Sequence, residues 1–483
     1  MKNLIEKYKN LPIQAKASIW FLVCSFFQKS VSMLTTPIFT RLLTTSEYGQ
    51  YSVFNSWLGV ATIIVSMNLA AGVFTQGLVK FEKERDIFAS SMQGLTLVLV
   101  FAWTIIYLMT YTFWNQLLGL TTVQMLAMLL MIWTSSAFSF WANYQRVDYK
   151  YKTLVVVTII VSLAKPIIGI IFVLKSTDKV TARILGLALV EIIFYSYFAF
   201  IQLHKGKVFI SKKYWKYSLF YSLPLIPHYL SQIVLESADR IMISDMCDSS
   251  KAGIYSLAYA LASIMILFNY ALTQTTSPWI YKKIKERKIN EIAPIAYMSL
   301  IIIAVANLLL ILFAPEAVAI FAPKSYYDAI WVIPPIAMSV YFMYAYDLFA
   351  KFAFYYEKTT LIMFASITGA LVNILLNSIF INIFGYIAAG YTTMICYIFY
   401  GLIHYLLMRW VCIHYCDGEK PYKFKNIVAI TIPFIILGLL FLFTYNYPVI
   451  RYGLIIVILG IIMFNYSKVS QIFVDILSLR KEN

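Results

Sequence analysis

The sequence predicts an all-α protein that crosses a membrane about fourteen times, and three observations support this fold class. The chain has 483 residues, of which 61% are hydrophobic and only 13% are charged, whereas a soluble protein keeps about 25% charged residues. The apolar residues are gathered in long runs, and the basic residues concentrate in alternate segments between those runs. The polar segments are short, so we expect no soluble domain on either side of the membrane.

The apolar runs have the length of membrane-spanning helices. A helix rises about 1.5 Å per residue, so roughly 20 apolar residues cross a hydrocarbon layer of ~30 Å. We expect the first run to be a retained span, because no small-residue cleavage site follows it. The expected spans are residues 16–39, 50–72, 87–110, 118–141, 153–174, 183–203, 218–243, 253–278, 293–314, 329–350, 360–383, 386–408, 426–445 and 449–467.

The distribution of Lys and Arg predicts the orientation. Of the 39 Lys and Arg, 29 fall in one alternating set of segments, 7 in the other set and the remaining three within spans. Cytoplasmic loops carry an excess of basic residues, so the larger set, which includes both chain ends, is assigned to the cytoplasm. The net charge of +17 therefore reflects topology and does not indicate nucleic-acid binding.

The chain repeats itself at an offset of roughly 200 residues. Residues 49–52 (GQYS) open the second expected span, and residues 253–256 (GIYS) open the eighth. The inward loops that follow carry residues 83–87 (KERDI) and 285–289 (KERKI). The two matches occur in the same order and at nearly the same offset, which indicates an internal repeat of six spans.

A repeat of six spans places both halves in the same orientation, because six is even. We therefore predict two parallel six-helix lobes, residues 1–210 and 211–410, followed by two additional spans and a cytoplasmic tail in residues 411–483. Parallel repeats of this kind occur in alternating-access transporters, whose substrate site lies between the halves.

Three ionisable residues are expected near the middle of the bilayer, namely Lys29, Lys165 and Glu191. A charge at that depth costs about 3 kcal/mol, so such residues usually face a bundle interior or a water-filled cavity. Lys165 and Glu191 lie on adjacent helices of one hairpin, where they favour a structural ion pair. The alternative is that Lys165 lines the transport lumen and Glu191 takes part in coupling. Lys29 has no evident partner, and it either lines an anion-binding cavity or contacts backbone carbonyls.

The seventh expected span, residues 218–243, is the most polar. Glu236 and Arg240 are four residues apart and share a helix face, which favours an ion pair within the helix. Arg240 is equally suited to contact substrate or to extend toward the membrane surface. His228 lies near mid-depth and is either a proton-exchanging group or a packed side chain. Asp239 is a further candidate for an ion pair or for ion coupling.

The sequence predicts neither a metal site nor a cofactor. Cys412, His414 and Cys416 are spaced closely enough to contact one metal ion. Structural zinc sites need four ligands, however, and we interpret the three residues as a coincidence at the membrane surface. The chain has no phosphate-binding loop, dinucleotide fingerprint or nucleophile motif, so we do not expect an enzyme.

Two segments resemble the Wzx type of bacterial polysaccharide flippase, which translocates O-antigen and capsule repeat units. The first segment, residues 36–51, reads TPIFTRLLTTSEYGQY and leads into the second span. The second combines residues 237–242 (SADRIM) with residues 253–256 (GIYS). The resemblance extends over essentially the whole chain in span count, internal repeat and length of the basic loops.

This resemblance, to a branch of the multidrug/oligosaccharidyl-lipid/polysaccharide exporter superfamily, implies two six-helix lobes around a central cavity. It also implies transport of an undecaprenyl-diphosphate-linked oligosaccharide from the inner to the outer leaflet of the bacterial cytoplasmic membrane. Such flippases have a cationic lumen, which Lys29, Lys165 and Arg240 would supply here. The implied partners are the lipid-linked oligosaccharide, membrane lipids and other polysaccharide-assembly proteins, and we expect a monomer.

Two other functions are weighed against this one. A drug or cation antiporter of the same superfamily should offer buried carboxylates, of which Glu191 is the convincing one at mid-depth. A membrane polysaccharide polymerase or lipid-dependent glycosyltransferase needs catalytic groups on a sizeable outer loop. The first outer loop offers only Arg41 and Glu47.

Overall fold

The structure of the protein is a computed structural model that describes residues 12–464. This part of the chain contains 18 α-helices, α2 to α19, and no strand, which confirms the all-α fold. The basic N-terminal residues and the basic C-terminal tail used to assign the orientation lie outside the described residues. The chain divides into two compact units, residues 1–233 and 234–483, each of which is described by itself. The predicted division into segments 1–210, 211–410 and 411–483 remains a prediction.

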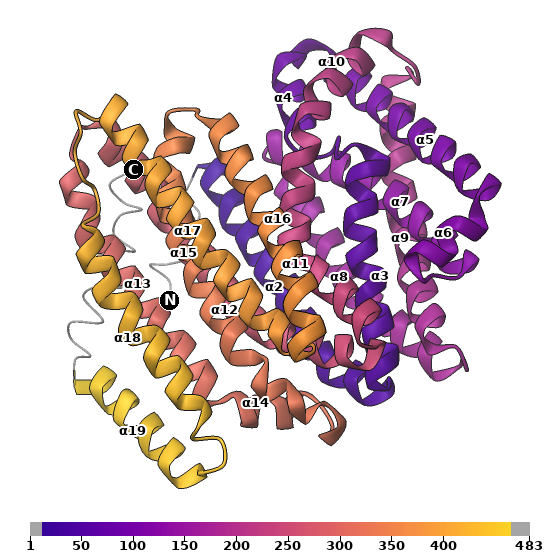
Figure 1. The fold of residues 1–483 in the computed structure, drawn as a ribbon. Helices are drawn as coiled ribbons and strands as arrows, with labels where there is room; N and C mark the ends of the chain where they lie inside the picture. Colours follow the sequence, from indigo (N-terminus) through magenta and orange to yellow (C-terminus); the bar gives the residue numbers. More distant parts are fainter. Residues whose placement is uncertain (1–11, 465–483) are drawn as a thin grey trace, which may run out of the picture. The chain divides into compact units, whose positions relative to one another are not determined.

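The N-terminal unit is built from nine helices, and a tenth, α11, continues from it into the C-terminal unit (Figure 1). These helices are α2 (Ile13–Leu42), α3 (Thr45–Ser66), α4 (Gly72–Lys80), α5 (Arg85–Met109), α6 (Tyr111–Leu118), α7 (Thr122–Val147), α8 (Tyr151–Leu174), α9 (Lys179–Gly206), α10 (Lys212–Ser222) and α11 (Ile226–Met246). Two short 3-10 turns connect them, η1 (Glu82–Glu84) and η2 (Leu223–Leu225).

Helix α9 organises the packing of the N-terminal unit, because it contacts α5, α7 and α8 extensively. Helix α8 in turn packs against α2. The α8–α9 contact is close: a Cβ atom on Gly186 would lie only 3.1 Å from the Cα atom of Gly169. Small residues allow membrane helices to approach in this way, and this approach brings the polar residues of α8 and α9 together.

The C-terminal unit continues with eight helices (Figure 1). They are α12 (Ser249–Lys285), α13 (Ile292–Leu312), α14 (Ala314–Phe321), α15 (Ile333–Tyr355), α16 (Thr359–Phe384), α17 (Ala388–Tyr415), α18 (Phe424–Leu442) and α19 (Pro448–Phe464). The 3-10 turns here are η3 (Ile289–Glu291) and η4 (Lys324–Trp331).

Helix α15 forms the centre of the C-terminal unit. Most of its residues are buried, and it packs against α12, α13 and α17. The preceding turn η4 meets α15 at an angle of 49°, where Pro334 and Pro335 stand in the first turn of the helix. The yellow helices α18 and α19 pack against α13, and α18 also contacts α15 (Figure 1).

Ten of the described helices are long and apolar enough to cross a membrane, or eleven when η4 and α15 are taken as one bent span. The predicted count of fourteen therefore remains a prediction. Helix α3 begins with a polar segment, α11 carries several charged residues, and the described part of α19 has only 17 residues. These local features explain why α3, α11 and α19 are not among the ten helices that are long and apolar enough to cross a membrane.

Two expected spans differ from the observed helices for local reasons. The span expected at residues 50–72 begins earlier, as α3, because Thr44 and Glu47 form a reciprocal capping box at its N-terminus. The span expected at residues 218–243 is divided into α10, η2 and α11. Pro224 lies within this break, and proline cannot donate the backbone hydrogen bond that a continuous helix requires.

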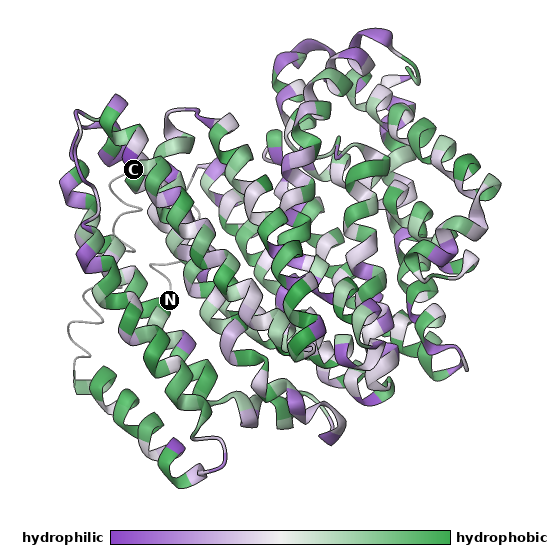
Figure 2. Ribbon diagram, viewed as in Figure 1, coloured by the Kyte–Doolittle hydropathy of each residue, from purple (hydrophilic) through white to green (hydrophobic). Residues whose placement is uncertain are grey.

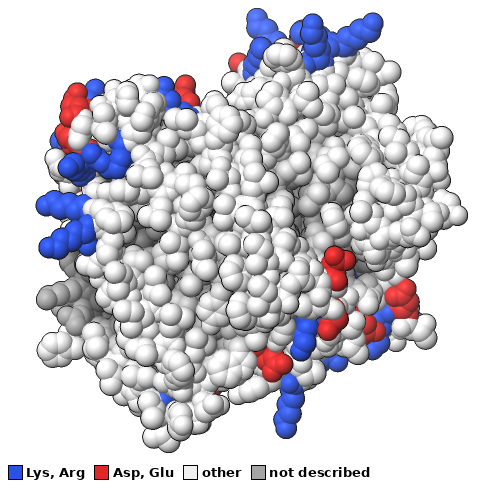
Figure 3. Space-filling model, viewed as in Figure 1, with Lys and Arg blue, Asp and Glu red and all other residues white. Residues whose placement is uncertain are grey.

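The surface has the polarity expected of a protein surrounded by lipid. Hydrophobic residues dominate the long helices, and hydrophilic residues are more frequent at their ends and in the connections (Figure 2). On the face shown in Figure 3, most charged side chains lie near the ends of helices, and the surface between them is largely uncharged. Exposed apolar side chains are therefore expected to contact acyl chains.

Candidate functional site

Helix α2 has an exposed polar face, which is unusual for a helix of this hydropathy. Four exposed residues spaced at i, i+3, i+4 and i+7 form this α2 polar face: Ser25, Gln28, Lys29 and Ser32. The roughly opposite side of α2 is also exposed but apolar, with Phe26 65% and Leu34 70% accessible. One helix thus presents two different exposed surfaces, and only the apolar one suits lipid. The α2 polar face requires water or a polar ligand.

Lys165 and Glu191 form the ion pair that was one of the two interpretations of these residues. The Lys165 Nζ atom lies 2.7 Å from Oε1 of Glu191, whose side chain is 5% exposed. Thr134 of α7 donates a hydrogen bond of 3.1 Å to the other carboxylate oxygen of Glu191. The Lys165 ammonium also lies 5.3 Å from the ring centroid of Tyr195. The cluster joins α7, α8 and α9, and its cation is already compensated by a carboxylate.

Asp239 lies at the centre of a buried hydrogen-bond network in the C-terminal unit. The residue is 1% exposed and accepts hydrogen bonds from the Asn377 amide (2.7 Å), the Thr393 hydroxyl (2.8 Å) and the Tyr255 hydroxyl. Asn377 in turn accepts from the Thr392 hydroxyl. These hydrogen-bond donors are all neutral, and they come from helices α12, α16 and α17.

The remaining predicted residues lie along α11. Arg240 donates a hydrogen bond of 2.9 Å from Nη1 to the backbone carbonyl of Glu236, and its guanidinium lies 4.3 Å from the ring centroid of Tyr259. The Glu236 side chain is exposed and Arg240 is partly buried. His228 is partly buried, and its Nδ1 atom has no hydrogen-bond partner among residues 12–464. The sequence predicted that Glu236, Arg240, His228 and Asp239 lie on one helix. The structure shows that Asp239 differs from the other three, because its side chain is buried in the hydrogen-bond network described above.

Arg183 is a functional candidate that sequence reasoning missed. Its guanidinium lies between two aromatic rings, 3.7 Å from the centroid of Phe39 and 3.5 Å from that of Tyr51. Nearby, Lys179 donates a hydrogen bond of 2.9 Å to the backbone carbonyl of Leu42. Phe39 and Tyr51 belong to the 36–51 segment that carries the family resemblance, so that segment forms an aromatic cage for a cation on α9. The aromatic residues Phe39, Tyr48 and Tyr51 of the segment were the available signal.

More Lys and Arg residues lie within helices than the three that were expected within spans. Helices α9, α15 and α19 include Arg183, Lys351 and Arg451. Lys351 is 6% exposed and lies 2.7 Å from Asp347. Arg451 is also buried and pairs with Glu316. Arg183 and Arg451 already fall within the spans expected at residues 183–203 and 449–467, so Lys29, Lys165 and Arg240 were an incomplete set of the Lys and Arg within spans. Lys351 joins them because α15 extends beyond the span expected at residues 329–350.

His404 is a second residue that the sequence did not single out, although it lies within the span expected at residues 386–408. It is 1% exposed, and neither ring nitrogen has a hydrogen-bond partner among the described residues. Its ring centroid lies 4.5 Å from that of Tyr400 in an edge-on arrangement. Two of the three residues weighed as metal ligands have other contacts: Cys416 donates to the Tyr356 hydroxyl, and the ring of His414 contacts the carbonyl of Trp410.

Residues 15–284, a little over half of the chain, match a family described as polysaccharide biosynthesis protein. Protein 1 of the Lsg locus of Haemophilus influenzae is 23% identical over 375 residues, covering 74% of this chain and 88% of that protein. A second H. influenzae protein, described as an uncharacterized membrane protein, is 21% identical over 369 residues, with the same two coverages.

Solved transporter structures share the fold. The lipid II flippase MurJ in an inward closed conformation matches with a TM-score of 0.70 at 16% identity, covering 93% of this chain and 100% of that chain. An inward-facing multidrug resistance MATE family transporter of the MOP superfamily matches with a TM-score of 0.59 at 14% identity, covering 81% of this chain and 96% of that chain. At these identities the likeness concerns the fold alone.

Proposed function

Since this chain belongs to the polysaccharide biosynthesis protein family, we propose that it is a flippase for a lipid-linked oligosaccharide. It moves an undecaprenyl-diphosphate-linked repeat unit from the inner to the outer leaflet of the bacterial cytoplasmic membrane, for surface polysaccharide assembly. Both chain ends lie in the cytoplasm. The observation that carries the proposal is the α2 polar face, on which Lys29 is exposed.

The chemistry of the cargo explains why such a face is needed. A diphosphate head cannot cross hydrocarbon unaided, because an unpaired charge there is very costly. A lysine in a wet cavity supplies compensating charge and hydrogen-bond donors to a phosphate. The lipid tail can remain in the bilayer while the head passes along the polar face. Alternating access between two parallel halves then moves the head without an open pore.

The candidate cations have different roles in this proposal. Lys29 binds the diphosphate, because its side chain is exposed on the α2 polar face. Arg240 is a second diphosphate ligand, because it is the basic residue of α11 and stays partly accessible. Lys165 is structural, because Glu191 already compensates its charge at 2.7 Å.

Asp239 is the residue we propose for ion coupling. A buried carboxylate is stable only when it is neutralised or well hydrogen-bonded, and its hydrogen-bond donors in this structure are neutral. The site can therefore accept a proton or a small cation without rearranging an existing ion pair. Glu191 is a weaker coupling candidate, because its ion pair with Lys165 would first have to break.

Transport by the purified protein tests the proposed function directly. Protein reconstituted in liposomes should carry a fluorescent undecaprenyl-diphosphate oligosaccharide between leaflets faster than protein-free liposomes. In cells, deletion of the gene should cause lipid-linked repeat units to accumulate on the cytoplasmic side. If the liposomes with protein match the empty ones and the deletion leaves surface polysaccharide unchanged, the function is wrong.

A drug or cation antiporter is the second candidate, and the buried carboxylate of Asp239 is the observation that favours it. Such a carrier binds its cationic substrate against lumen carboxylates. A deletion strain should then become more susceptible to cationic drugs while its surface polysaccharide stays normal. The flippase predicts the reverse outcome in both measurements.

A further inference from the structure

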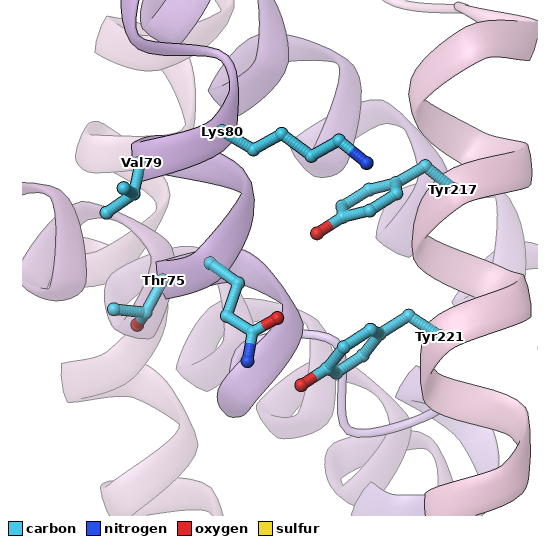
Figure 4. Close-up of a pocket in the computed structure, with 6 residues that line it drawn as sticks. Thr75, Val79, Lys80, Tyr217 and Tyr221 are labelled. Atoms are coloured by element: carbon cyan, nitrogen blue, oxygen red, sulfur yellow. The ribbon is translucent and has the colours of Figure 1, made fainter.

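A pocket in the N-terminal unit lies apart from the α2 polar face. Helices α4 and α10 line an open pocket of about 610 Å³, within the range of small-molecule sites. In Figure 4, Lys80 extends from α4 across the ring of Tyr217, and the hydroxyls of Tyr217 and Tyr221 point back toward α4. The lining residues are Thr75, Gln76, Val79, Lys80, Tyr217 and Tyr221. The cavity thus combines one cation with hydroxyl and amide groups.

The wall formed by α10 is held rigidly. The indole nitrogen of Trp215 donates a hydrogen bond of 2.9 Å to the carbonyl of Ser91 on α5. Phe81 packs edge-on against Tyr214 and Tyr217, with ring centroids 5.0 and 5.3 Å apart. Because these contacts fix α10 against the fully buried Phe88 and its neighbours, the pocket exists before any ligand enters it.

The ammonium of Lys80 is available to an anionic ligand. Its Nζ atom lies 4.4 Å from the ring centroid of Tyr217, and no carboxylate lies within ion-pair distance of it in the described part of the chain. The nearby acidic residues are already engaged: Glu82 pairs with Arg85 at 3.6 Å, and Glu84 pairs with Lys213 at 2.6 Å. A positive charge without a counterion beside two hydroxyl groups matches the needs of a phosphate.

One residue of the pocket lining is both apolar and well exposed: Val79 is 64% exposed. Phe220 of α10 lies outside the lining and is 81% exposed. Phe220 follows Tyr217 by three residues and therefore lies on a similar side of α10. A ligand with an anionic head and an apolar tail would contact both Lys80 and these exposed apolar side chains, whereas a free anion would contact Lys80 alone.

We propose that the α4–α10 pocket binds the phosphate-bearing head of a membrane-anchored amphiphile, with the phosphate at Lys80 and the tail along Val79 and Phe220. By the positive-inside pattern of the sequence, this pocket opens on the cytoplasmic side. The inference goes beyond the proposed flippase activity, because the pocket can hold such a head whether or not the chain transports it.

Binding to the full-length protein in detergent tests this site. Native mass spectrometry would measure retention of three probes: an undecaprenyl-diphosphate sugar, phosphatidylglycerol and inorganic phosphate. Lys80→Gln should weaken binding of the amphiphile about tenfold, the effect of losing one charged hydrogen bond. The matched control is Lys212→Gln, which removes an exposed lysine of α10 that does not line the pocket. Lys80→Arg should restore most of the binding.

The outcomes separate the possible ligands. The site is supported if Lys80→Gln loses binding of either lipid probe while Lys212→Gln binds as the unaltered protein does. If the unaltered protein prefers the diphosphate sugar to phosphatidylglycerol, the pocket is a receiving site for the cargo. The proposal is overturned if Lys80→Gln retains the lipid probes as well as the unaltered protein does. It is also overturned if inorganic phosphate competes for the pocket as well as the lipids do. Thermal unfolding of each variant confirms that it is folded. Failure of this test leaves the flippase proposal intact, because transport in liposomes is measured separately.

Discussion

Two tyrosines at equivalent positions of the predicted internal repeat have opposite electrostatic roles. Tyr51 and Tyr255 each stand near the start of a helix, and the helix N-caps Thr44 and Asp248 are separated by the same 204 residues as the two tyrosines. The ring of Tyr51 faces the cation of Arg183 at 3.5 Å. The hydroxyl of Tyr255 instead donates to the buried carboxylate of Asp239.

The comparison shows what a repeat specifies and what it leaves free. The shared sequence sets the start of each helix and the position of its aromatic side chain, because capping and helix geometry are local. The charge that meets the tyrosine comes from another helix, which differs between the two units. In the N-terminal unit a π face holds a cation, and in the C-terminal unit a hydroxyl group satisfies an anion.

The largest expected effect concerns the ion pair between Lys165 and Glu191 in the N-terminal unit. Lys165→Met would leave Glu191 buried without its cation, which typically costs about 3–5 kcal/mol of unfolding free energy. The double variant Lys165→Met/Glu191→Leu should recover most of this loss, because no charge remains buried. Unfolding of the purified protein would measure both. A single variant as stable as the unaltered protein would contradict a structural ion pair.

The two repeat-related tyrosines can be compared by removing each hydroxyl group. Tyr255→Phe deprives a buried carboxylate of a donor and should cost about 1.5–3 kcal/mol of unfolding free energy. Tyr51→Phe keeps the ring that faces Arg183 and should change stability by less than about 0.5 kcal/mol. Thermal unfolding of both variants in the same detergent is the measurement. Equal losses would show that the two tyrosines do not differ in the way proposed.

A transport measurement tests the role of Lys29. Lys29→Ala should reduce flipping in liposomes about tenfold, the effect of losing one charged hydrogen bond to the diphosphate. Among molecules that remain folded, Lys165→Ala should have a smaller effect, because that lysine is already paired. Lys152→Ala removes an exposed lysine at the start of α8 and serves as the control. Full transport by Lys29→Ala at normal expression would remove the residue from the proposed site.

A small effect is expected when the cation of the aromatic cage is replaced. Arg183→Lys keeps the positive charge but loses the planar group that lies between Phe39 and Tyr51. We expect a loss of about 0.5–1 kcal/mol of unfolding free energy, as for a weakened cation–π contact. Thermal unfolding would measure it. An unchanged midpoint would mean that the cage contributes little to holding α9 against α2 and α3.

Local sequence was sufficient to predict the helices and one of the charged contacts. Apolar runs of about 20 residues predict membrane helices because burying the backbone in lipid requires helical hydrogen bonding. Lys165 and Glu191 could be related in advance because they lie on consecutive helices at similar depth. The α2 polar face also follows from helical spacing, although exposure was needed to separate it from a packed face.

The sequence by itself therefore determined the all-α membrane fold, predicted the internal repeat, and placed Lys29 within α2 and several polar residues within α11. Only the tertiary structure decided which charges are compensated and which remain available. The hydrogen-bond donors to Asp239 include Asn377 and Thr393, which lie more than 130 residues away in the chain, and the α4–α10 pocket joins helices far apart in the sequence. The physical reason is that helix formation depends on neighbours within a few residues, whereas the partner of a side chain depends on which distant helix packs against it.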